Sequence, residues 1–221
     1  MRPVGRPRSA HRQATGDTRE EILGAAADLF GTNGYTATST GAIAQAVGLR
    51  QASLFYYYPS KEAILAELLD RTVRPTLDLT RRLDEAALGP ESTLWVVAER
   101  DVTNLCSGSH NLGVLQLLPE SHAVQFAWFW RRRQRLFDFY RRQIRQGSDA
   151  GLFPAAAGAS SPDLVFGLVE SVITARPSVR RDRTIGAGVA DTVLRMLGVP
   201  PGQLRRARRR GIVFEEHDRG S

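Results

Sequence analysis

The sequence has a single cysteine, Cys106, and no long apolar run. One cysteine excludes an intramolecular disulfide and a metal cluster held by several cysteines, so we expect a reducing, cytoplasmic setting and no metal site. A membrane helix needs about 18 or more apolar residues in succession, and the N-terminus lacks the apolar segment of a secretory signal. These absences predict a protein that is neither secreted nor embedded in a membrane.

The sequence motifs of common enzymes are absent as well. There is no G-x-S-x-G nucleophile motif, no glycine-rich phosphate loop after a strand and no H-E-x-x-H zinc motif. Cys106 and His110 lie in a stretch of small residues with no orienting partner nearby. We therefore expect no catalytic residues and no cofactor.

One stretch of the chain, between Asp28 and Glu62, has very few charged side chains. The formal net charge is +7, yet no acidic residue occurs between Asp28 and Glu62, and the only charged side chains in that window are Arg50 and Lys61, the single lysine of the chain. Such a window can approach a polyanion without like-charge repulsion.

The 221 residues have 42% hydrophobic and 24% charged side chains, which is typical of a globular protein with one large domain or a small domain joined to a larger one. Residues 1–15 contain four Arg and two Pro and have too few large apolar side chains to fold, so they predict a flexible basic arm.

Residues 16–76 contain the signals of a helix-turn-helix domain, with the motif at about 39–58. The spacing of Thr18 and Glu21 predicts a helix that begins near Thr18 and stops at Gly34. Ser39 can cap a second short helix, residues 47–49 form a tight turn, and a third helix runs from Arg50 to Tyr58, before Pro59. Ser60 can cap the next helix. Two short helices about a glycine turn, with longer helices on both sides, are typical of this motif.

The rest of the chain has helical and no alternating strand periodicity, so the predicted fold class is all-α. Residues 77–202 are expected to form a larger helical domain, and residues 203–221 a basic and then acidic tail. Pro75 and Gly89-Pro90 are predicted breaks. The expected helices span 94–105, 112–118, 121–146 (the longest), about 164–176, and 184–197.

Residues 18–69 resemble the DNA-binding domain of the tetracycline-repressor (TetR) family of bacterial transcription regulators. The resemblance covers about a quarter of the chain and rests on motifs in family order: Leu29-Phe30, Gly34-Tyr35, Thr40-x-x-Ile43-Ala44, Val47-Gly48-Leu49, Leu54-Phe55-Tyr56-Tyr57-Tyr58 and Pro59-Ser60-Lys61-Glu62. It implies a homodimer that docks its second and third helices on a palindromic double-stranded DNA operator. It also implies a repressor that a small molecule releases. A ligand-independent architectural protein or an activator on the same fold stays open as the alternative.

The residues expected to contact DNA lie around the third helix. Side chains at the N-terminal end of a recognition helix reach base edges, where Arg pairs with guanine and Gln with adenine. Helix N-termini and hydroxyls bind phosphates. Phe55, where the family often has Tyr, and Tyr58 are expected in the core. The expected DNA-binding residues are Ser39, Thr40, Arg50, Gln51, Ala52, Ser53, Tyr56, Tyr57 and Lys61.

Two further sets of arginines have open roles. Gly5-Arg6-Pro7-Arg8 looks like the core of an AT-hook, in which Arg6 and Arg8 would enter a narrow minor groove, but a solvated arm is the alternative. The runs at 131–133 and 205–210 are read as solvated faces or tails.

The larger domain is expected to hold an apolar or aromatic ligand and the dimer interface. Aromatic side chains concentrate in this part of the chain and line either a ligand pocket or an ordinary core. Gly167, Ser171 and Ala175 would allow a partner helix to approach, so the homodimer is expected to form through the last two predicted helices. The residues singled out for ligand binding are Trp95, His122, Phe126, Trp130 and Glu170, with His110 as a further polar candidate.

Overall fold

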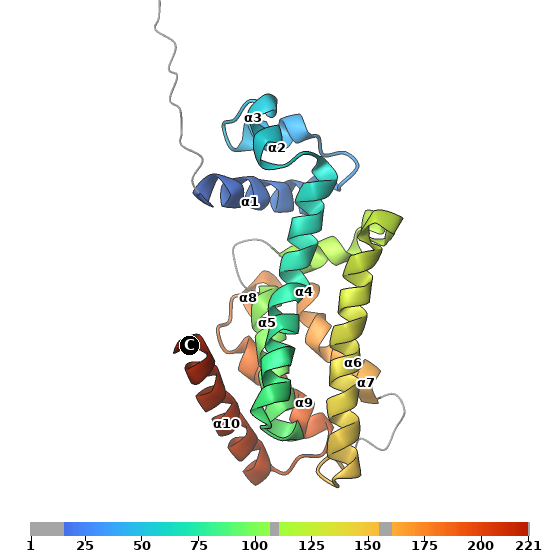
Figure 1. Ribbon diagram of the computed structural model, residues 1–221, viewed down its shortest axis with the longest axis vertical. Helices are drawn as coiled ribbons and strands as arrows, with labels where there is room; N and C mark the ends of the chain where they lie inside the picture. The colour runs from blue at the N-terminus through green and yellow to red at the C-terminus, as the bar shows by residue number, and fades with distance from the viewer. Residues whose placement is uncertain (1–15, 107–110, 155–160, 221) are drawn as a thin grey trace, which may run out of the picture. The chain divides into compact units, whose positions relative to one another are not determined.

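The computed structural model describes residues 16–106, 111–154 and 161–220, which form helices and turns with no strand in these ranges (Figure 1). The predicted all-α class is thereby confirmed. The chain divides into two compact units, residues 1–64 and 65–221. Their boundary falls inside helix α4 (Lys61–Ala86), which also contains residue 76, the predicted end of the helix-turn-helix domain.

The first unit consists of α1 (Gly16–Asn33), α2 (Thr40–Ala46), α3 (Gln51–Tyr57) and the start of α4. Ser39 caps α2 through its Oγ, which accepts from the N–H of Ala42 at 3.0 Å, and Ser60 Oγ accepts from the N–H of Ala63 at 3.2 Å. Both predicted caps are confirmed. Gly48 has φ +69°, a conformation that glycine adopts without strain, and this permits the predicted turn between α2 and α3.

The core of the first unit comes from residues at helical spacing. Ile22, Ala26 and Phe30 lie on one face of α1 and are fully buried. They are joined by one or two residues from each following helix, among them Ile43, Leu54 and Ile64. Because α2 and α3 are short and bury few side chains, their remaining faces stay available to a partner.

The second unit is a helical bundle around α5 (Pro90–Cys106), in which every residue from Ser92 to Ala98 is buried. Helices α6, α7, α9 and α10 all pack against α5. The surrounding elements are the rest of α4, the 3₁₀ turns η1 (Leu112–Leu117), η2 (Pro119–His122) and η3 (Val124–Phe126), α6 (Ala127–Asp149), α7 (Ser161–Glu170), η4 (Ser171–Ile173), α8 (Pro177–Arg180), α9 (Ile185–Met196) and α10 (Pro201–Gly220).

Several predicted helix boundaries in this unit are wrong. The expected long helix 121–146 begins only at Ala127, and 3₁₀ turns precede it. The helix expected up to Pro177 ends at Glu170 and continues as η4. The longest helix is α4, with 26 residues. A 3₁₀ turn has nearly the same apolar spacing as an α-helix, so periodicity alone cannot distinguish a 3₁₀ turn from a turn of α-helix.

The predicted C-terminal tail is also wrong, because residues 201–220 form helix α10. Its buried stripe consists of Leu204, Ala207, Gly211 and Glu215. Glu215 accepts from Arg100 of α5 at 2.7 and 3.1 Å, and Asp218 pairs with Arg82 of α4 at 2.5 Å. Two of the four buried residues are small and one is charged, so the segment has little of the apolar periodicity that identifies a helix.

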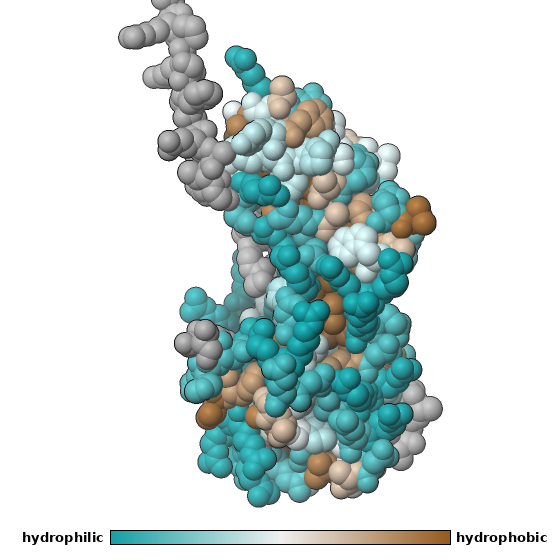
Figure 2. Space-filling view, viewed as in Figure 1, coloured by the Kyte–Doolittle hydropathy of each residue, from teal (hydrophilic) through white to brown (hydrophobic). Residues whose placement is uncertain are grey.

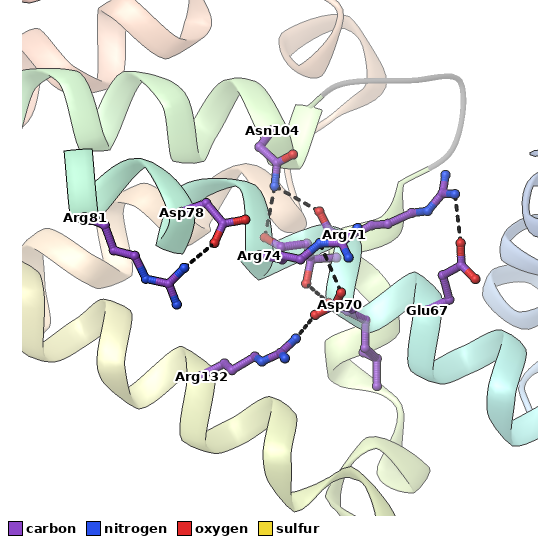
Figure 3. Close-up of polar contacts among 10 residues, drawn as sticks. Glu67, Asp70, Arg71, Arg74, Asp78, Arg81, Asn104 and Arg132 are labelled. Atoms are coloured by element: carbon purple, nitrogen blue, oxygen red, sulfur yellow. Dashed lines mark hydrogen bonds and ion pairs between the residues drawn. The ribbon is translucent and has the colours of Figure 1, made fainter. Parts of the chain in front are cut away.

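Pro75, a predicted break, lies inside α4. Proline has no N–H, so the carbonyl of Arg71, four residues earlier, loses its helical donor. Asn104 of α5 replaces it: its Nδ2 donates to the carbonyl of Arg71 at 3.1 Å and to that of Thr72 at 3.0 Å (Figure 3). The neighbouring helix therefore compensates for the proline, and α4 continues.

This compensation predicts a coupling between Asn104 and Pro75. We expect Asn104→Ala to lower the free energy of unfolding by about 1–3 kcal/mol, because the carbonyl of Arg71 then has neither its helical donor nor the Asn104 amide. In a Pro75→Ala background the restored N–H can serve Arg71, so the same truncation should cost less. Urea unfolding of the four proteins of this double-mutant cycle measures the difference. Equal costs in both backgrounds would contradict the assignment.

One face of the second unit, over α4 and α6, is mostly hydrophilic (Figure 2). Among the described helices, none is long and apolar enough to span a membrane.

Candidate nucleic-acid interface and ligand cavity

Helix α3 presents one buried row and one open face. Leu54 is buried, as is Tyr58 just beyond the helix, whereas Arg50, Gln51, Ala52 and Ser53 are exposed. Arg50 is the N-cap and its side chain makes no capping hydrogen bond. The N-terminal end of α3 is therefore open to solvent, with a guanidinium and an amide side by side in the sequence.

Gln51 is held by the preceding helix. Its Nε2 donates to Thr40 Oγ1, at the first position of α2, at a distance of 2.8 Å. An amide group has two N–H donors and a carbonyl acceptor. One donor bound to Thr40 leaves the second donor and the acceptor, which is the pair that the N7 and N6 groups of adenine require.

We expect Gln51→Ala to change base preference at one position of the bound DNA, by about 1–3 kcal/mol, since one bidentate contact is lost. The salt dependence of binding should stay the same, because no phosphate contact is removed. Selection of oligonucleotides followed by anisotropy titrations measures both. Thr40→Val removes the hydroxyl that orients Gln51 and also an expected phosphate contact, so it should produce a smaller loss at the same position together with a weaker salt dependence. A uniform loss over all sequences from Gln51→Ala would contradict a base-reading role.

The other predicted contact residues surround this end. Ser39 is exposed at the N-terminus of α2, and Tyr56, 80% exposed, packs edge-on against Tyr57 at 5.4 Å. Lys61 has a further role: its Nζ donates to the carbonyls of Tyr35 and Thr38, both at 2.8 Å, and lies 4.2 Å from the Tyr35 ring centroid. Lys61 thus holds the loop before α2, and one of its three N–H donors is left for a phosphate.

Phe55 was expected in the core, and this prediction is wrong: its side chain is 45% exposed. It follows Leu54 by one position, about 100° around the helix, and a helix of seven residues buries only one row. Tyr58 is buried, as predicted. Arg6 and Arg8 of the proposed arm lie outside the described residues, as does His110.

A cavity of about 340 Å³ lies between α6 and α7 in the second unit. Aromatic rings of both helices line it, together with an ion pair formed by Arg133 of α6 and Glu170 of α7. The Arg133 guanidinium also lies 5.3 Å from the Trp130 ring and 5.6 Å from the Phe166 ring. The lining residues are Trp130, Arg133, Gln134, Phe137, Asp163, Phe166, Gly167 and Glu170.

A buried carboxylate in α5, Asp101, belongs to the same cluster of charges. It accepts from Thr76 Oγ1 at 3.2 Å and from Tyr140 Oη at 3.4 Å. Burial, and next the charge of Glu170, raise the pKa of Asp101 to about 7. Burial also raises the pKa of Glu170, which the charge of Arg133 opposes. The acid at the centre of the bundle therefore titrates near neutral pH.

The predicted ligand residues separate into two groups. Trp130 and Glu170 line the cavity, and His122 stacks on the Trp130 ring at 4.3 Å, although it is not a lining residue. Phe126 is fully buried, and Trp95 donates from Nε1 to Asp191 at 2.8 Å on the α9 side of α5. Neither Phe126 nor Trp95 lines the cavity.

The sequence did not identify Arg133, Phe166 and Asp101 as residues of this site. It also did not indicate that the arginines at 131–133 have different partners. Arg131 is exposed, Arg132 pairs with Asp70 of α4, and Arg133 pairs with Glu170 of α7 (Figure 3 shows the Asp70 pair). Asp70 also pairs with Arg74 at 3.2 Å. Neighbours on a helix are about 100° apart, so this run could have been divided among different faces. Its partners, 62 and 37 residues away, give no local signal.

Comparison with known proteins agrees with this architecture. Residues 22–68 match the family described as bacterial regulatory proteins, tetR family. The crystal structure of AmtR from Mycobacterium smegmatis has a TM-score of 0.76 and 37% identity, with 91% of this chain and 95% of that chain covered. PfmR, a TetR family transcriptional regulator from Thermus thermophilus, has a TM-score of 0.64 and 26% identity, with 79% and 97% covered.

Two curated relatives match over shorter regions. The HTH-type transcriptional regulator QacR of Staphylococcus aureus is 38% identical over 52 residues, which are 24% of this chain and 28% of QacR. The fatty acid metabolism regulator protein of Bacillus subtilis is 25% identical over 99 residues, 44% of this chain and 50% of that protein. The matches thus span half or less of the length of these two relatives.

Proposed function

The chain belongs to the TetR family of bacterial regulatory proteins. We propose that it is a homodimeric repressor that binds a palindromic DNA operator. The repressor releases the operator when a small molecule binds. The observation that carries the proposal is the exposed N-terminal end of α3, where the Arg50 side chain makes no capping hydrogen bond and Thr40 holds Gln51. A recognition helix in the major groove uses these positions to read bases.

Phosphate binding would come from groups around α3. The N-terminus of α2 carries Ser39 and Thr40, and hydroxyls are available from Tyr56 and Tyr57. The absence of acidic residues between Asp28 and Glu62 keeps repulsion low along this segment. Base contacts would specify the operator, and these phosphate contacts would fix the helix on it.

A homodimer would form through α7 and α9, which pack against each other. Leu164 of α7 is 60% exposed and Met196 of α9 is 38% exposed. Gly188 of α9 has open space around a Cβ position, so a partner helix can approach closely there, whereas Gly167 of α7 lines the α6–α7 cavity. Exposed apolar side chains beside small residues favour helix packing of this kind.

The effector would bind in the cavity between α6 and α7. Its rings suit an apolar or aromatic molecule, and its volume lies at the lower end of the range of ligand sites. Helix α6 is also joined to α4 through Arg132 and Asp70, and α4 begins in the unit that carries α3. An effector that moves Arg133 would therefore act on the helix that leads to the DNA-binding unit. This cavity favours ligand-responsive repression over the ligand-independent alternative.

Selection of random oligonucleotides by the full chain tests the DNA-binding part. We expect a palindrome whose half-sites are separated by about one helical turn or a multiple of it. Binding without sequence preference would overturn the proposal. A compound screen for operator release tests the effector part: an active compound should lose its effect in Phe137→Ala and keep it in Asp149→Asn, at the exposed end of α6. Release that is insensitive to Phe137→Ala would place the effector elsewhere.

A further inference from the structure

A second pocket, of about 510 Å³ and open to solvent, lies at the corner between α9 and α10, and the proposed function does not use it. Two buried apolar side chains, Val199 and Leu204, form part of its wall. The other lining residues are Asp191, Arg195, Gly198, Pro200, Pro201, Arg205 and Arg208. Its volume is within the range of small-molecule sites.

Positive charge is in excess in this cavity, since three arginines face one aspartate. Asp191 accepts from Trp95 Nε1 at 2.8 Å and from Arg208 at 3.2 Å, and it pairs with Arg195 at 3.7 Å. Arg205 forms no ion pair or hydrogen bond with the residues that the structure describes. A guanidinium has five N–H donors, so one shared carboxylate leaves most donors of the three arginines available.

The frame that carries these arginines is rigid. Trp95 of α5 anchors Asp191, and α10 packs tightly on α5: a Cβ on Gly211 would lie 2.6 Å from Trp95 and 2.8 Å from Val96. Pro200 and Pro201 restrict the backbone of the corner. Arg205 and Arg208 lie one turn apart on a helix held in this way, so the backbone needs little ordering when a ligand binds.

We propose that this corner binds a small amphiphilic anion, with a carboxylate or phosphate headgroup on the arginines and an apolar part against Val199 and Leu204. Guanidinium groups bind both headgroups through paired hydrogen bonds. The arginine run of α10, which the DNA-binding role leaves unassigned, thereby supplies a ligand site. The site is separate from the α6–α7 cavity, so it does not depend on the proposed effector response.

Calorimetric titration of the full chain with probes of equal chain length tests the chemistry. The probes are octanoate, octyl phosphate, octanol and octylamine, with inorganic phosphate as the headgroup alone. We expect octanoate or octyl phosphate, or both, to bind at least tenfold more tightly than octanol and inorganic phosphate, and octylamine not to bind. The better of the two anions identifies the headgroup. Equal affinity for octanol and the anions would overturn the proposal, because the arginines would then contribute nothing.

Variants locate the site. Arg205→Gln should weaken binding of the preferred anion about tenfold, and Arg195→Gln combined with it should weaken binding further; neither side chain holds α10 in place. Arg209→Gln removes the same charge from the exposed side of α10 and should leave binding unchanged. Phe137→Ala, in the α6–α7 cavity, should also have no effect. Equal losses in Arg205→Gln and Arg209→Gln, or a loss in Phe137→Ala, would overturn the assignment.

Discussion

Replacement of Asp101 by asparagine is expected to raise the free energy of unfolding at pH 8.5 and to leave it near the original value, or below it, at pH 5. The folded protein holds the pKa of Asp101 at about 7, against an ordinary value of 3.8, chiefly because the carboxyl is buried. Each unit of such a difference corresponds to about 1.4 kcal/mol. The ionised carboxylate therefore destabilises the folded chain by up to about 4 kcal/mol.

The direction with pH follows from proton binding. Between about pH 4 and pH 7 the folded state holds the Asp101 proton more often than the unfolded state, so stability falls as the pH rises through this window. Asparagine removes this dependence. Its buried NH₂ group lacks an assigned acceptor, at a cost of about 1–3 kcal/mol at every pH. The substitution should thus be more favourable at pH 8.5 than at pH 5 by about 2–3 kcal/mol.

Denaturant unfolding of the original chain and of Asp101→Asn at both pH values measures this difference. Asp149→Asn, at the exposed end of α6, is the control, because it makes the same chemical change away from the buried cluster. Its effect should be small at both pH values. If Asp101→Asn changed stability by the same amount at pH 5 and pH 8.5, the buried carboxyl would not be the group that titrates.

Leu164→Arg is expected to abolish dimer formation and to weaken operator binding by a factor of about 100 or more. The substitution puts a charge on α7 at a position where an apolar side chain is exposed and where we propose that the partner subunit packs. Two linked half-site contacts exceed either one alone by factors of about 100–10,000, so a monomer loses this advantage. Binding to an isolated half-site should stay unchanged.

Light scattering coupled to size exclusion gives the oligomeric state, and fluorescence anisotropy with whole and half operators gives the affinities. Val213→Arg is the matched control: Val213 is also 60% exposed but lies on α10. It should leave both quantities unchanged. Dimer loss in Val213→Arg with retention in Leu164→Arg would place the interface on α10.

The helix-turn-helix unit could be predicted from the sequence because its signals are local. The hydroxyl of a cap and the N–H that it serves are three residues apart, as for Ser39 and Ala42, and the turn depends on one glycine, Gly48. The exposed side of α3 was predicted for Gln51 and Tyr56 but not for Phe55, because hydrophobicity alone does not say which row of a short helix is buried.

Parts of the second unit could not be predicted from the sequence, because residues far away in the chain stabilise its helices. Pro75 stays within α4 because Asn104 donates to the carbonyl that the proline leaves without a donor. Helix α10 has a weak apolar stripe and is held by Arg100 and Arg82 from two other helices. The sequence of α4 around Pro75 and the sequence of α10 do not indicate these partners, which lie on other helices or far away in the chain.

The all-α class, the helix-turn-helix unit with its two serine caps and the residues at the end of α3 can all be predicted from the sequence alone. These features depend on residues a few positions apart. The packing of the helices decides instead that three consecutive arginines reach solvent, α4 and α7 in turn, and that Asp101 lies buried beside Glu170 and Tyr140. Such pairings follow from the packing of whole helices, because the free energy of burying a charge depends on groups far away in the chain.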